Sequence, residues 1–177
     1  MLVDPTPEIE AIAESIPDAP GPEDIEANLR FRKAIGDMGD KSADFQKAWH
    51  LKCSRDPVFW MNCVAWTKNP KDFPKDPVRP VVLFPNQAGY IEWLHDHVER
   101  GKPGLLRKSR EQLASVATSN YGLWRFIYRE NASMLVGSYK KDVVEGVSYA
   151  KSILPKIDFT ISKMRDWMLP EGWVRGK

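Results

Sequence analysis

The chain has 177 residues, of which 42% are hydrophobic and 28% are charged, a composition that suits one domain with a real hydrophobic core. No apolar run approaches the ~20 residues that a membrane-spanning helix requires, and the first residues lack the regions of a secretory signal. Cys53 and Cys63 stand in no metal-ligand spacing and beside aromatic residues. We therefore expect buried free thiols and a cytoplasmic protein.

The net charge of +2 conceals an acidic start and a basic body. Residues 1–29 contain eight of the 24 acidic residues and none of the 26 basic ones, which leaves residues 30–177 with an excess of ten basic residues. Charge alone favours a solvated surface, but a basic body also suits contact with DNA phosphates. Residues 1–22 are rich in proline as well as acidic, and we expect a mobile arm with short helical pieces.

A mostly helical region is expected over residues 23–79. Pro22 before it and two glycines after it bound a helix at 24–35, and two further helices are expected at 42–51 and 57–67. The last of these has aromatic residues at helical spacing, which indicates core packing rather than a ligand site. Prolines throughout 68–79 predict a loop.

Strands and helices are expected to alternate in residues 80–177. A helix at 86–100 precedes a short strand at 105–107, a polar loop, a helix at 112–129 and a strand at 134–137. The two strands are expected to be parallel neighbours, joined by a right-handed crossover helix. The expected fold class is α/β: an incomplete parallel-sheet core like that of the P-loop NTPases, beside the helical N-terminal region.

The polar loop before residue 115 has the arrangement of a degenerate phosphate-binding loop (Walker A). In the pattern G-x-x-x-x-G-K-[ST], backbone N–H groups surround the phosphates at a helix N-terminus and the hydroxyl reaches the metal. Here Leu113 stands at the second glycine, Ala114 at the lysine and Ser115 at the hydroxyl, while Lys108 supplies the cation at the front of the loop. Glycine permits a positive φ that a leucine resists, so we expect weak binding.

A lysine at the front of the loop, followed by Ser-Arg, resembles the ATPase motor of the large terminase subunit of tailed phages. Five elements follow that family's order over about residues 52–173. These are 56–60 with 64–67 ("DPxxF…VWT"), 83–87 ("LFPxQ"), 108–116 ("K-S-R-[DE]-[MQ]-G-[VA]-[ST]-W"), 135–141 ("GFGSRK") and 167–170 ("xWLLP"). Leu113 in place of glycine and Val116 in place of tryptophan depart from the pattern.

The resemblance implies a site for ATP and Mg²⁺. Lys108 would neutralise phosphate charge and Ser115 would hold the metal. Arg110 would contact phosphate, with an ordinary surface arginine as the alternative. Gln87 would recognise adenine, with a polar residue at a helix start as the alternative. The full set of implied nucleotide-binding residues is Gln87, Lys108, Ser109, Arg110, Glu111, Gln112, Leu113, Ala114 and Ser115.

The resemblance also implies a function: the N-terminal segment of the motor that packages double-stranded DNA into procapsids, with the portal and the small terminase subunit as partners. The full-length motor would be a homo-oligomer in the cytoplasm of a phage-infected or prophage-carrying bacterium. No apolar strand ending in an acid pair is found, so we expect no ATP hydrolysis by this chain alone. Two alternatives stay open: a non-catalytic terminase remnant that binds DNA or protein, and an unrelated helical binding protein. A structure without a strand-loop-helix at 105–129 would leave only the last of these.

Overall fold

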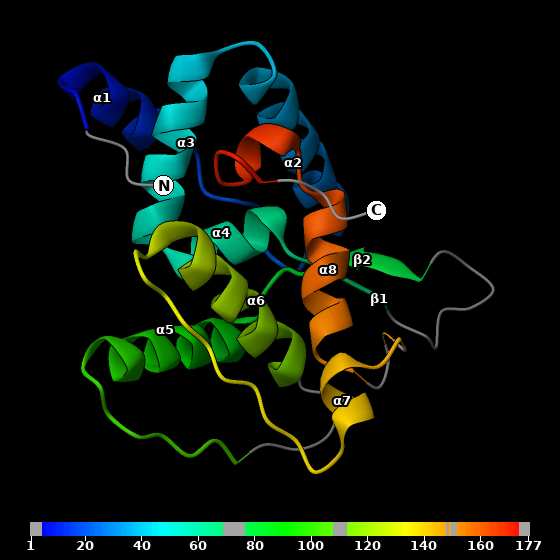
Figure 1. The fold of residues 1–177 in the computed structure, drawn as a ribbon. Helices are drawn as coiled ribbons and strands as arrows, with labels where there is room; N and C mark the ends of the chain where they lie inside the picture. The colour runs from blue at the N-terminus through cyan, green and yellow to red at the C-terminus, as the bar shows by residue number, and fades with distance from the viewer. Residues whose placement is uncertain (1–4, 69–76, 108–112, 148, 150–151, 174–177) are drawn as a thin grey trace.

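The computed structural model describes residues 5–68, 77–107, 113–147, 149 and 152–173, and over these ranges the chain is mostly helical (Figure 1). Within them, no helix is both long and apolar enough to cross a membrane. The helices are α1 (Pro7–Ser15), α2 (Ile25–Gly39), α3 (Ala43–Arg55), α4 (Pro57–Val64), α5 (Pro85–Glu99), α6 (Ala114–Tyr128), α7 (Lys141–Glu145) and α8 (Leu154–Lys163), and a 3-10 turn spans Asp166–Met168.

Side-chain caps fix where the first four helices begin. In each case the residue before the helix accepts a hydrogen bond from a backbone N–H in the first turn, which satisfies a donor that has no partner within the helix. The helices predicted at 24–35 and 42–51 are confirmed, and both continue four residues further. The arm expected at 1–22 includes α1, which packs on α3. The capping residues are Thr6, Asp24, Ser42 and Asp56.

The expected α/β class is wrong. The sheet of the described residues has two short antiparallel strands, β1 (Trp66–Lys68) and β2 (Val78–Pro80), instead of a parallel core. Residues 105–107 and 134–137, predicted as neighbouring strands, are irregular, and Leu105 and Leu135 are almost fully exposed. Apolar runs of two or three residues are too short to specify a strand, which needs a partner for its backbone groups.

The predicted crossover helix exists as α6, but its surroundings are helical. It contacts α4, α5 and α8, and 11 of its 15 residues are buried. Its Trp124 is fully buried, with Nε1 donating to the carbonyl of Cys53 at 2.8 Å. A crossover helix and a central bundle helix both need wide apolar surfaces, so the sequence pattern did not distinguish them.

Arg32 joins the end of α4 to both strands. Its guanidinium donates to the carbonyl oxygens of Asn62 (2.8 Å), Ala65 (2.9 Å) and Val81 (2.9 Å). Its Nε also donates to the side chain of Asn28 at 2.7 Å, one turn earlier on α2. The predicted helix 57–67 therefore stops at Val64, where the freed carbonyls find these donors and the chain enters β1.

Two glycines expected to follow the helix belong to α2, which ends at Gly39, and they provide a flat surface on it. Trp167 lies against Gly39, and its Nε1 donates to Asp40 at 3.1 Å. The guanidinium of Arg165 lies over Gly36, where a Cβ would be 3.1 Å from Nε. Close approach of the C-terminal segment explains both glycines, and Gly39 is also the last residue of α2.

Because Trp167 packs on Gly39, we expect alanine at this position and alanine at a control glycine to change the free energy of unfolding in opposite directions. Gly39→Ala should destabilise the fold by about 2 kcal/mol, because its Cβ would overlap the Trp167 ring. Gly89→Ala is the matched control: Gly89 is an exposed helical residue of α5 with no atom near its added Cβ, and alanine should stabilise by about 0.5–1 kcal/mol. Urea denaturation of both variants checks this. Equal stabilities would mean that Trp167 does not pack on α2.

Candidate functional site

The structure describes four of the nine predicted site residues. Gln87 lies in the first turn of α5, and Leu113, Ala114 and Ser115 lie at the start of α6. Helices α5 and α6 contact each other. The other five predicted residues, Lys108, Ser109, Arg110, Glu111 and Gln112, are outside the described residues.

Leu113 has a left-handed backbone directly before α6, with φ 59° and ψ −1°. For a non-glycine residue this conformation costs roughly 1–2 kcal/mol. The half-buried side chain packs against the hydrophobic core, and that contact offsets part of the cost. The phosphate-loop pattern has glycine at this position, so the leucine adopts the backbone conformation that glycine would allow.

Ser115 is the one exposed residue among the first four of α6. Its hydroxyl has no hydrogen-bond partner among the described residues, whereas Thr118 and Ser119 donate back to the carbonyls of Ala114 (2.8 Å) and Ser115 (2.7 Å). A pocket of about 280 Å³ lies over this turn, lined by Ser115 together with Leu106, Ala114, Thr118, Ser119, Met134, Val136 and Ile153.

Ser115, the predicted metal ligand, therefore has an exposed hydroxyl that no other described residue engages. Within the described ranges there is no group of three or more His, Cys, Asp or Glu residues that could hold a metal ion. A Mg²⁺ held here would keep most of its ligands as phosphate oxygens and water, which is the usual preference of this ion.

Gln87 takes part in the local structure of α5. Its Oε1 accepts a hydrogen bond from the backbone N–H of Phe84 at 3.0 Å, just before the helix. This contact matches the alternative that the sequence left open, a polar residue at a helix start.

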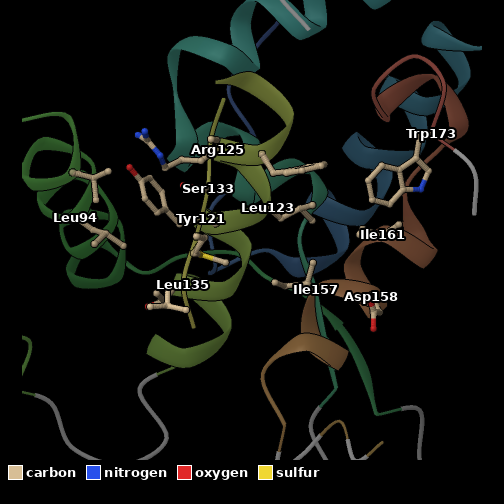
Figure 2. Close-up of a pocket in the computed structure, with 16 residues that line it drawn as sticks. Leu94, Tyr121, Leu123, Arg125, Ser133, Leu135, Ile157, Asp158, Ile161 and Trp173 are labelled. Carbon is tan, nitrogen blue, oxygen red and sulfur yellow. The ribbon is translucent and has the colours of Figure 1, made fainter. Parts of the chain in front are cut away.

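A second, larger pocket of about 700 Å³ lies between α5, α6 and α8 (Figure 2). Figure 2 shows Leu94 and Tyr121 at one side, and Ile161 and Trp173 at the other. Residues 132–135 run along it, and Met134 lies directly against Gly122 of α6. Neither α8 nor this pocket was predicted from the sequence, because the lining residues come from segments that only the fold brings together.

The polar groups near this larger pocket are largely paired. Arg125 donates to Glu99 of α5 and lowers the pKa of that carboxyl, and Arg129 lies 3.7 Å from the same carboxylate. Desolvation raises the pKa of Tyr121, whose hydroxyl lies 3.1 Å from Nδ1 of His95. With apolar walls and a neutralised charge cluster, the pocket suits an apolar group better than an ion.

The histidines and cysteines have structural roles, as expected for the cysteines. Cys53 and Cys63 are buried free thiols, and burial raises the pKa of both. Nε2 of His50 lies 2.8 Å from the carbonyl of Trp167, and Nδ1 lies 3.0 Å from the hydroxyl of Tyr128. A carbonyl only accepts, so Nε2 carries the proton of the neutral ring and Nδ1 accepts from Tyr128.

No known protein family, curated protein or solved structure matches this chain.

The buried His50 predicts a loss of stability in mild acid. Desolvation lowers its pKa below the ordinary 6.5, so the unfolded chain binds the proton more readily. The free energy of unfolding should therefore fall as the pH drops below about 6.5. Urea denaturation on either side of this pH checks the effect. His50→Gln should be less stable at neutral pH but should lose less on acidification; an unchanged acid loss in this variant would assign it to other groups.

Proposed function

We propose that the chain is the N-terminal segment of a phage terminase large subunit and that residues 108–115 bind the phosphates of ATP with Mg²⁺. One observation carries the proposal: Leu113 has a left-handed conformation at the position where the phosphate loop has glycine. A strained backbone at one point of a loop needs surroundings that impose it, and such strain is concentrated at ligand-binding sites.

The chemistry of the neighbouring groups agrees with this role. Helix α6 begins directly after Leu113, and the side chain of Leu113 does not cap it. The N-terminal end of a helix carries partial positive charge that favours phosphate. Lys108 would add a full charge, and the exposed hydroxyl of Ser115 would contact the metal or its water.

The DNA partner of the proposal is supported by charge. The excess of ten basic residues in 30–177 suits sequence-independent contact with duplex phosphates. The portal and the small terminase subunit follow as partners from the proposed family alone.

A second candidate function is a helical binding module without nucleotide chemistry. The observation that favours it is the irregular backbone of residues 105–107, where the motor resemblance implies a strand. In that case the left-handed Leu113 would serve only to turn the chain into α6. Nucleotide binding distinguishes the two candidates.

ATP with Mg²⁺ should raise the melting temperature of the chain. At ten times the dissociation constant the stabilisation is about 1.4 kcal/mol, or about 3–6 °C for a chain of this size. Lys108→Ala should abolish the shift. Lys102→Ala, an exposed lysine shortly before the loop, should keep it. A shift that survives Lys108→Ala, or no shift in the parent chain at saturating ATP, would select the helical binding module.

Substitutions at Leu113 separate backbone strain from packing. Leu113→Gly and Leu113→Ala both remove the side chain that packs on the core, but only glycine relieves the positive φ. The glycine variant should therefore be more stable than the alanine variant by about 1 kcal/mol and should bind ATP more tightly than the parent chain. ATP titrations and urea denaturation measure both quantities. Weaker binding by the glycine variant would show that the Leu113 side chain, not the loop conformation, is what the site needs.

A further inference from the structure

A basic pocket of about 280 Å³ lies on another part of the molecule, between α2, the start of β1 and the end of α8. Figure 1 shows where these elements lie in the fold. Four positively charged residues line it: Arg32 and Lys33 from α2, Lys163 from the last turn of α8, and Arg165 just after it. The remaining lining is mainly apolar and comes from Leu29, Gly36, Cys63, Val64, Trp66, Met164 and Met168.

The positive charges of this pocket are not fully compensated by the protein. Arg165 is paired with Asp37 (3.5 Å) and Asp40 (3.0 Å). Arg32, Lys33 and Lys163 have no carboxylate within ion-pair distance in the part of the chain that the structure describes. Three like charges around one cavity repel one another, and an anion placed between them would remove that repulsion.

Arg32 is fixed in place at the pocket wall. Four hydrogen bonds, to Asn28 and to three backbone carbonyls, hold its guanidinium, and the ring of Trp66 lies 5.0 Å from its central carbon. These bonds use four of its five N–H groups, so one on Nη1 remains for a ligand. Its charge is therefore positioned before any ligand arrives, which lowers the cost of binding.

We propose that this pocket binds a phosphate group. A fixed guanidinium with flexible lysine ammonium groups around it is the donor set that suits tetrahedral oxyanions, and the apolar walls strengthen the attraction by excluding water. The phosphate is either a free ion or part of a nucleic-acid backbone. Lys68 and Lys163 lie 4.4 Å and 5.6 Å from the ring of Phe159, so further positive charge continues from the pocket toward β1 and could follow a backbone.

This pocket goes beyond the proposed nucleotide site, because none of its lining residues belongs to residues 108–115. Its test therefore starts from Lys108→Ala, in which the loop has lost its cation. Inorganic pyrophosphate, followed by titration calorimetry, should still bind Lys108→Ala, the background in which the pocket and control variants are compared. Loss of pyrophosphate binding in Lys108→Ala would place the phosphate in the loop and overturn the proposal.

Two double variants with the same change in net charge locate the binding. Lys33→Ala with Lys163→Ala should weaken pyrophosphate binding by about tenfold or more. The matched control removes two exposed lysines that are paired with Asp44 and Glu145, by Lys47→Ala with Lys141→Ala, and should change the dissociation constant less than about twofold. Lys33→Arg with Lys163→Arg should retain binding. Equal losses in the pocket and control variants would overturn the proposal.

A further measurement, with duplex DNA, identifies the source of the phosphate. Fluorescence anisotropy with a labelled duplex, at fixed salt, compares the same variants. If the pocket holds a backbone phosphate, the pocket variant should lose far more DNA affinity than the control. Equal DNA affinities, together with the selective loss of pyrophosphate binding, would assign the pocket to a free phosphate.

Discussion

The guanidinium of Arg32 is the contact on which the rest of the structure depends. A helix leaves its last carbonyls without partners, and at the end of α4 three carbonyl groups from two segments converge on this one side chain. Burial lowers the pKa of Arg32 to about 9, so it remains charged at neutral pH. Loss of this side chain would take one donor from each of these carbonyls. Those of Asn62 and Ala65 would keep a second donor, Nδ2 of Asn28 and the N–H of Val81, and a buried acceptor left without any donor would destabilise the fold by about 1–3 kcal/mol.

The position of the strands and of α8 follows from that junction. Once Ala65 is held, Trp66 enters β1 and its backbone N–H and carbonyl both lie 3.3 Å from Thr160 of α8. α8 in turn contacts α6, whose apolar surface is covered from several directions. The outcome is a helical packing centred on α6, in which a short antiparallel ribbon joins α8 to the N-terminal helices.

Features that depend on residues close together in the sequence were predicted, whereas features that depend on residues far apart in the sequence were not. Local signals, such as the capping oxygens of Asp24 and Ser42, located α2 and α3 correctly. Gly36 was wrongly placed beyond the helix, and the contacts of Gly36 and Gly39 were not predicted, because those contacts are made by residues far along the chain. The position of the left-handed turn was marked by the phosphate-loop pattern, but that a leucine adopts it depends on core packing. The basic pocket combines Lys33 with Lys163, which no sequence spacing relates.

The contact of Trp167 with α2 has a consequence for how the chain folds during synthesis. The hydrogen bond from Trp167 to Asp40 spans 127 positions, and the same residue supplies the carbonyl that the ring of His50 contacts. Contacts of such separation close large loops and form late. While the first helices emerge from the ribosome, the flat side of α2 and the ring of His50 are still without these partners. Until residue 167 has emerged, this half-covered surface is open to aggregation or to capture by a chaperone.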